Sequence, residues 1–84
     1  MSKVIWDPKA QKNFARLAKQ DPRGADQVLD GISLLLRNPR PAGAHPYGKN
    51  WYRIHMGFYR VIYEIKSEKP VIISVEHVGR GNTP

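Results

Sequence analysis

The sequence predicts an α+β domain in which a two-helix hairpin packs on one face of a small, mainly antiparallel four-stranded sheet. Three observations lead to this architecture. Two Asp-Pro pairs each precede a stretch with helical spacing of apolar residues. Residues 51–65 alternate with a period of two, as strands do, and prolines and glycines crowd residues 39–50 between the two patterns. The predicted order is β-α-α-β-β-β in a single domain over residues 1–84.

Composition restricts the classes of function. The chain has 84 residues, 40% of them hydrophobic, which suits one small domain with a thin core. It contains no cysteine, which excludes disulfides and zinc–thiolate sites and fits a cytoplasmic location. The N-terminal residues MSKVIW lack the apolar run of a signal peptide, and no stretch approaches the roughly 18 apolar residues of a membrane span.

The net charge indicates an anionic partner. The formal charge is +7 at pH 7, which is more than solubility requires of a domain this small. The partner would be a nucleic acid or an acidic protein.

The first half of the chain predicts a strand and a helical hairpin. Residues 3–6 (KVIW) form the strand. A helix begins at Asp7-Pro8, where the aspartate caps and the proline occupies the first turn, and a second begins in the same way at Asp21-Pro22. The second helix ends at Asn38-Pro39. The apolar stripes are Ala10, Phe14, Leu17 and Ala18 in the first helix, and Ala25, Val28, Leu29, Ile32, Leu35 and Leu36 in the second.

The second half predicts three strands, near residues 51–56, 58–66 and 71–79, after a loop over 39–50. Gly57 breaks the alternation between the first two. One face of this hairpin is mostly apolar and should meet the helices, while the other carries polar side chains. In the last strand, His77 shares the parity of Ile73 and is expected to face the helices. The apolar face of the hairpin over residues 51–65 comprises Tyr52, Ile54, Met56, Tyr59, Val61, Tyr63 and Ile65. The polar face comprises Trp51, Arg53, His55, Phe58, Arg60, Ile62 and Glu64.

Three stretches carry a resemblance to a known family: NPRPAGAHPYG, YRIHMGFYRVIYEI and VIISVEHVGRG. Together they resemble the RelE/ParE superfamily of bacterial and archaeal toxins, the RelE branch in particular. The resemblance covers nearly the whole chain. It implies a toxin of a type II toxin–antitoxin system that cleaves mRNA in the ribosomal A site, beside 16S rRNA, without a metal or other cofactor. It also implies an antitoxin partner and a toxin–antitoxin hetero-oligomer. ParE-like relatives share the fold and inhibit DNA gyrase instead.

The resemblance also assigns roles to residues. Arg53 and His55 fall on two basic positions, Arg60 on a phosphate-binding arginine, and Arg80 at or one position before an arginine near the end of the last strand. The sequence departs from the RelE pattern in two respects. His55 replaces a lysine, and the chain reaches Pro84 without the tyrosine that stacks on the mRNA base. The second departure favours a gyrase inhibitor, or a weakened toxin that mainly binds its antitoxin.

The chemistry of these residues suits RNA cleavage. Arginine matches phosphate with a bidentate fork, so Arg53, Arg60 and Arg80 are candidates for stabilising the phosphate. Histidine exchanges protons near neutral pH, so His55 is the candidate acid or base. Glu64 or Glu76 would act as a base or would simply pair with Arg60. The expected catalytic set is Arg53, His55, Arg60 and Arg80, and the expected RNA contacts are Lys49, Trp51, Arg53, Arg60 and Arg80.

A metal site is not expected. His45 lies in the predicted loop, while His55 and His77 belong to different strands and are expected to face opposite sides of the sheet.

Overall fold

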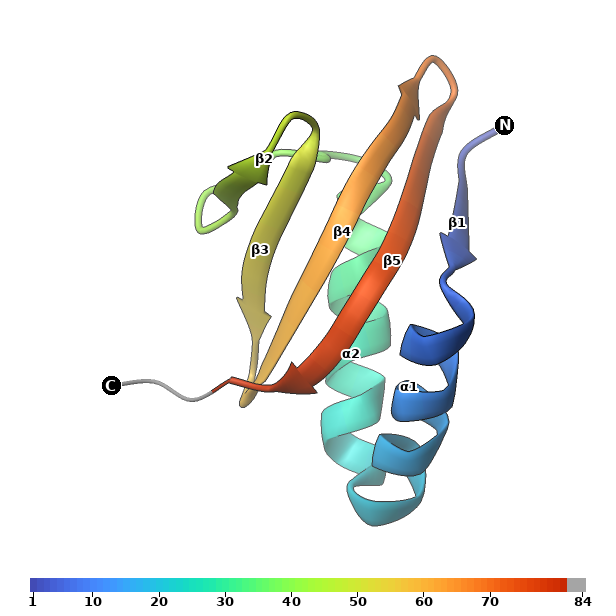
Figure 1. The fold of residues 1–84 in the computed structure, drawn as a ribbon, viewed down its shortest axis with the longest axis vertical. Coiled ribbons are helices and arrows are strands. Elements are labelled where there is room, and N and C mark those ends of the chain that lie inside the picture. Colours follow the sequence, from blue (N-terminus) through green and yellow to red (C-terminus); the bar gives the residue numbers. More distant parts are fainter. Residues whose placement is uncertain (82–84) are drawn as a thin grey trace.

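A computed structural model describes residues 1–81 of the 84-residue chain. The elements follow the predicted order with one additional strand (Figure 1). They are β1 (Lys3–Trp6), α1 (Pro8–Gln20), α2 (Pro22–Leu35), β2 (His45–Gly48), β3 (Trp51–Met56), β4 (Tyr59–Glu68) and β5 (Val71–Arg80).

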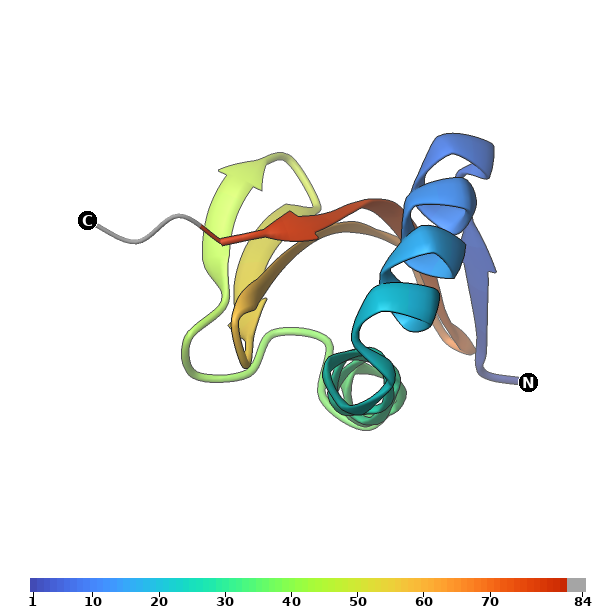
Figure 2. The same cartoon turned by 90° about the horizontal axis from the view of Figure 1, so that it is seen from below.

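The five strands form one sheet in the order β1-β5-β4-β3-β2. The short N-terminal strand runs parallel to β5, and every other neighbouring pair is antiparallel. Figures 1 and 2 show α2 behind the sheet and α1 beside β5, so the opposite face of β3 and β4 has no helix over it. The predicted α+β class and helical hairpin are confirmed, and the sheet has five strands where four were predicted.

The additional strand is β2, within the segment predicted to be a loop. His45 lies opposite Arg53, and Pro46 opposite Tyr52. The prediction was wrong here because the HPYG sequence has no period-two alternation and contains a proline, which cannot donate to a ladder. An edge strand tolerates proline, since one of its sides needs no partner.

Both predicted helix starts are confirmed by their caps. The Asp7 carboxylate accepts hydrogen bonds from the backbone N–H groups of Lys9 (3.0 Å) and Ala10 (3.3 Å). At the second helix, the Asp21 carboxylate accepts one from the N–H of Gly24 (3.0 Å). Each aspartate thus satisfies amide groups that have no partner within the helix.

The core lies between the helices and the apolar face of the sheet. The side chains of Val61, Tyr63, Ile73 and Val75 are fully buried there, against Val28 of α2. This confirms the predicted face assignment for β3, β4 and the first half of β5. The predicted stripe of the second helix is right except at Leu29, which is 41% exposed.

A β-bulge changes the alternation in β5. Ile62 lies opposite His77 and Tyr63 opposite Val75, so Glu76 has no partner on β4. Beyond this extra residue the alternation is reversed. Val78 is therefore buried and His77 exposed. The prediction that His77 faces the helices was wrong for this reason.

Gly24 of α2 provides a test of the packing between helix and sheet. A Cβ at this position would lie 2.6 Å from Cε2 of the buried Tyr59 ring and would also collide with the Asp21 carboxylate. In an open helix, Gly→Ala stabilises by about 1 kcal/mol. Here we expect Gly24→Ala to destabilise the fold, by about 1–3 kcal/mol as overpacking does. The measurement is urea unfolding at equilibrium.

Gly31 of the same helix is the matched control. A Cβ there would lie 2.6 Å from Sδ of Met56, a flexible thioether that can move aside. Gly31→Ala should therefore cost less than Gly24→Ala. A Gly24→Ala protein more stable than the parent would contradict the packing described for Tyr59.

Candidate functional site

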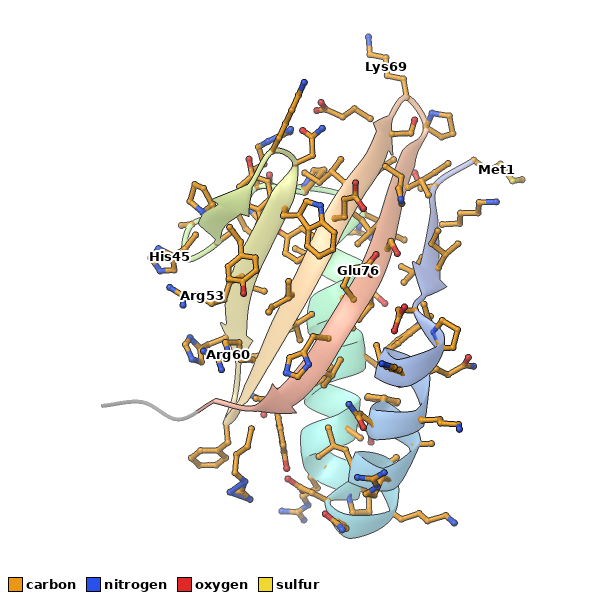
Figure 3. All side chains as sticks on the ribbon, viewed as in Figure 1. Met1, His45, Arg53, Arg60, Lys69 and Glu76 are labelled. Carbon is orange, nitrogen blue, oxygen red and sulfur yellow. The ribbon has the colours of Figure 1, made fainter. Side chains whose placement is uncertain are left out.

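The polar residues predicted to share a face do so, on the side of the sheet opposite α2. We call this surface the open face; it comprises the outward residues of β3, β4 and β5 with the neighbouring part of β2. His55, Arg60 and Gly79 form one row across three strands. The adjacent row is His45, Arg53, Ile62 and His77. Figure 3 shows His45, Arg53 and Arg60 on these neighbouring strands.

The side chain of Arg60 on the open face has a buried donor without a partner. The residue is half-buried, and its Nε is buried without a hydrogen-bond partner. The carboxylates considered as its partners are engaged elsewhere. Glu64 pairs with Lys66 at 3.1 Å, and Glu76 accepts a hydrogen bond from the Ser74 hydroxyl at 2.6 Å. A buried donor without a partner costs free energy, which an incoming acceptor would recover.

His55 is exposed and lies beside Arg60. A Cβ placed on Gly81 would lie 2.9 Å from Nε2 of His55 and 3.6 Å from Cβ of Arg60. The Gly81 N–H donates to the carbonyl of Phe58 at 2.9 Å, which fixes the chain as it leaves β5. The imidazole therefore lies over the end of the sheet, next to the guanidinium-bearing side chain.

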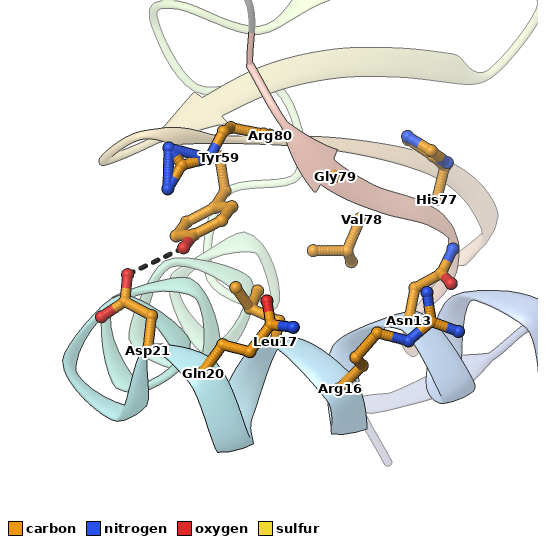
Figure 4. Close-up of a pocket in the computed structure, with 10 residues that line it drawn as sticks. All are labelled: Asn13, Arg16, Leu17, Gln20, Asp21, Tyr59, His77, Val78, Gly79 and Arg80. Carbon is orange, nitrogen blue, oxygen red and sulfur yellow. Dashed lines mark hydrogen bonds between the residues drawn. The ribbon is translucent and has the colours of Figure 1, made fainter.

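Arg80 lies on the other face of the sheet. It is opposite Tyr59, and its guanidinium carbon is 5.9 Å from the centre of that ring, on the helix side. The hydroxyl of Tyr59 donates to the Asp21 carboxylate at 2.7 Å (Figure 4). The structure thus brings together Arg53, His55 and Arg60 of the predicted catalytic set and separates Arg80 from them.

The predicted RNA contacts Lys49 and Trp51 lie towards the other end of the open face. Lys49 is exposed in the turn between β2 and β3. Trp51 is half-buried and opposite Glu64, two residues along β3 from Arg53. The site therefore spans the length of β3.

His45 and His77 belong to the same face, which the sequence did not indicate. Neither β2 nor the bulge at Glu76 has a pattern that reveals it. All three histidines consequently face the same side, contrary to the prediction that His55 and His77 face opposite sides of the sheet. In the part of the chain that the structure describes, no group of three or more potential ligands is placed to hold a metal ion.

The loop before β2 is fixed by contacts on the helix side. The guanidinium of Arg40 binds Glu68 with two hydrogen bonds, of 2.8 and 3.4 Å, and its Nε donates to the hydroxyl of Tyr52 at 2.9 Å. The hydroxyl of Tyr63 donates to the carbonyl of Pro39 at 2.6 Å, and burial raises the pKa of Tyr63 to about 12. These bonds hold the chain where β2 can pair with β3.

Two cavities border the open face, the first lined in part by His77 and Gly79 and the second in part by His55. One, of about 340 Å³, separates α1 from the end of β5 (Figure 4). The other, of about 430 Å³, is a mostly apolar groove between α2 and β3; its lining includes Leu34, Leu35, Ile54 and Met56. Leu34 is 62% exposed along this groove.

Comparisons with known proteins point to one family. The model of a family described as the ParE toxin of the type II toxin–antitoxin system, parDE, matches residues 4–82. No curated protein matches the sequence. No helix within residues 1–81 is long and apolar enough to cross a membrane.

Solved toxin structures share the fold. The isolated E. coli RelE toxin is 21% identical with a TM-score of 0.75, over 96% of this chain and 85% of that chain. The YoeB/ParE toxin from Agrobacterium tumefaciens is 16% identical with a TM-score of 0.81, over 95% and 99%. A chain of the intact E. coli RelBE toxin–antitoxin complex is 22% identical with a TM-score of 0.74, over 95% and 96%. At these identities the likeness establishes the fold.

The bond between Tyr59 and Asp21 yields a prediction about titration. The hydroxyl of Tyr59, and then the amide of Gly24, lower the pKa of Asp21 by stabilising its carboxylate. Tyr59→Phe removes the larger of these causes, so we expect the pKa of Asp21 to rise. The amide of Gly24 should keep that pKa below the ordinary aspartate value. Carbon-detected NMR titration of the side-chain carboxyl measures the shift.

The same change has a defined effect on stability. A carboxylate whose folded pKa is depressed stabilises the fold above its unfolded pKa, and this contribution is lost as the pH falls through the folded value. The stability difference between the parent and Tyr59→Phe should therefore narrow as the pH is lowered through the acidic range. An unchanged pKa of Asp21 in the variant would show that the bond is not formed in solution.

Proposed function

Since the chain belongs to the ParE toxin family of type II toxin–antitoxin systems, we propose that this toxin is a metal-independent endoribonuclease that cleaves mRNA on the ribosome. The observation that carries the proposal is the environment of the Arg60 side chain. Its side chain is half-buried on the open face, its Nε has no hydrogen-bond partner, and His55 lies beside it. This arrangement offers a phosphate-binding group next to a residue that can transfer protons.

The geometry supports the following roles. Arg60 binds the scissile phosphate and stabilises the negative charge that grows as the 2′-oxygen attacks. Arg53, one row along the sheet, binds a neighbouring phosphate. His55 transfers a proton to or from the reacting oxygens. Lys49 and Trp51 extend the RNA contact along β3, the tryptophan by stacking on a base.

We further propose an antitoxin partner that assembles with this chain into a hetero-oligomer. One of the solved neighbours is a toxin–antitoxin complex. The apolar groove between α2 and β3 is of the kind that accepts the apolar face of an amphipathic helix, and Leu34 is exposed along it. The net charge of +7 favours an acidic partner.

Inhibition of DNA gyrase without catalysis is the second candidate function. Two observations favour it. The matching family model is that of ParE, and Arg80 lies away from His55 and Arg60. The open face would then bind a protein surface. A supercoiling assay with purified gyrase separates this candidate from the ribonuclease, since only a gyrase inhibitor would block supercoiling while leaving RNA intact.

Replacement of Arg60 tests the proposed ribonuclease. Loss of one group that stabilises transition-state charge typically lowers a rate by about 10²–10³. Arg60→Ala should reduce in-cell mRNA cleavage by this factor and relieve growth arrest. Arg60→Lys should restore cleavage only in part, because an ammonium group cannot bind phosphate with two parallel hydrogen bonds. Primer extension on cellular mRNA measures the cleavage.

The matched control is Arg23→Ala, which removes the same charge from an exposed position on α2. It should leave cleavage unchanged. A thermal melt of each purified variant distinguishes loss of the site from loss of the fold. If Arg60→Ala cleaves at the parental rate, the open face is not the catalytic site; if it unfolds, Arg60 is a structural residue.

A further inference from the structure

We propose that His77 is a second proton-transfer residue of the open face, acting with His55 on a phosphate held at Arg60. This inference rests on the proposed ribonuclease function and deepens it. Its origin is the bulge at Glu76, which turns His77 from the helix side to the open face. The ring points away from α1 (Figure 4), and the residue is exposed.

Two glycines locate both imidazoles over the end of β5. A Cβ on Gly79 would lie 2.8 Å from Nε2 of His77, and a Cβ on Gly81 would lie 2.9 Å from Nε2 of His55. Two residues of extended chain span about 7 Å. The two reactive nitrogens therefore approach the same short stretch of backbone, from two sides.

Arg60 lies between the two histidines. It is opposite His55 on β3 and opposite Gly79 on β5. Its Cβ is 3.6 Å from where a Cβ on Gly81 would be. A phosphate bound to its guanidinium would consequently have one imidazole on each side.

The glycines leave the space that a phosphate needs. Positive φ angles occur at Gly43, Gly48 and Gly57 but not at Gly79 or Gly81, so the backbone conformation does not require glycine at these last two positions. A Cβ at either position would lie within 3.0 Å of an imidazole, which would have to move away from its present place. Because both residues lack a side chain, the backbone surface between His55, Arg60 and His77 is left uncovered.

The reaction balances with these groups alone. The neutral imidazole takes the proton of the 2′-hydroxyl as O2′ bonds to phosphorus. The bond from phosphorus to O5′ breaks, and the other histidine, protonated at the start, gives its proton to O5′. The products are a 2′,3′-cyclic phosphate and a 5′-hydroxyl, and the two histidines have exchanged protonation states.

Charged groups from three elements surround His77. Arg60 lies diagonally across on β4, and Arg16 of α1 lines the same cavity as His77, between α1 and β5. Glu76 precedes it on the bulge with its carboxylate bonded to Ser74, and Arg80 follows on the helix side. Around His55 the charged neighbours are Arg53 and Arg60 on the same face. Arg37, just after α2, lines with His55 the groove between α2 and β3.

The test is the pH dependence of cleavage by the full-length toxin on ribosome-bound mRNA, under single-turnover conditions. With one histidine as acid and the other as base, the parent should give a bell-shaped profile. His77→Gln should lower the rate by about 10²–10⁴ and abolish one limb of the bell. Lys12→Gln, which removes a titrating side chain from the exposed surface of α1, is the control and should keep both the rate and the bell.

A second variant keeps the test decisive if His77→Gln does not fold. Gly79→Ala retains every titrating group and displaces the imidazole of His77, so it should slow cleavage without changing the parental products. Cleavage by His77→Gln at the parental rate with an intact bell overturns the inference and leaves the ribonuclease function standing. A parent that cleaves no RNA overturns both.

Discussion

Burial on one side of the sheet is the constraint on which the rest of this structure depends. The helices cover a single face, where Val61, Tyr63 and Ile73 are fully buried. Because side chains alternate along a strand, burying these residues sends their neighbours to the opposite face. Arg60 and Glu64 flank the buried positions of β4 and are therefore on the open face. The location of the proposed site follows from the packing of the core.

Much of this arrangement could be predicted from local patterns. The Asp-Pro pairs predicted both helix starts because capping and the fixed φ of proline act within one turn. The alternation of residues 51–65 predicted the faces of β3 and β4. The strand β2 could not be predicted in this way, because it forms by pairing with β3 and the loop before it is placed by long-range contacts such as that of Arg40 with Glu68. These two residues are 28 positions apart, and no short-range pattern relates them.

The bulge at Glu76 accounts for both discrepancies at the site. Continuing the alternation of Ile73 and Val75 places His77 on the helix side, and no residue of β5 marks the bulge, so the sequence alone did not reveal the reversal. A single unopposed residue brings His77 onto the open face and moves Arg80 to the helix side, next to Tyr59. The site thereby gains an imidazole and loses a guanidinium. That exchange suits proton transfer more than additional binding of phosphate.

The central claim is that the open face binds a phosphate at Arg60, and NMR tests it directly. The protein is titrated with a short RNA in which 2′-deoxynucleotides prevent cleavage, and the Nε–Hε signals of its arginines are followed. We predict that the Arg60 signal shifts first and most, because its Nε is the buried donor without a partner. Arg23, on the exposed surface of α2, should not respond. Shifts confined to arginines of the helices, with Arg60 unchanged at saturation, would contradict the account.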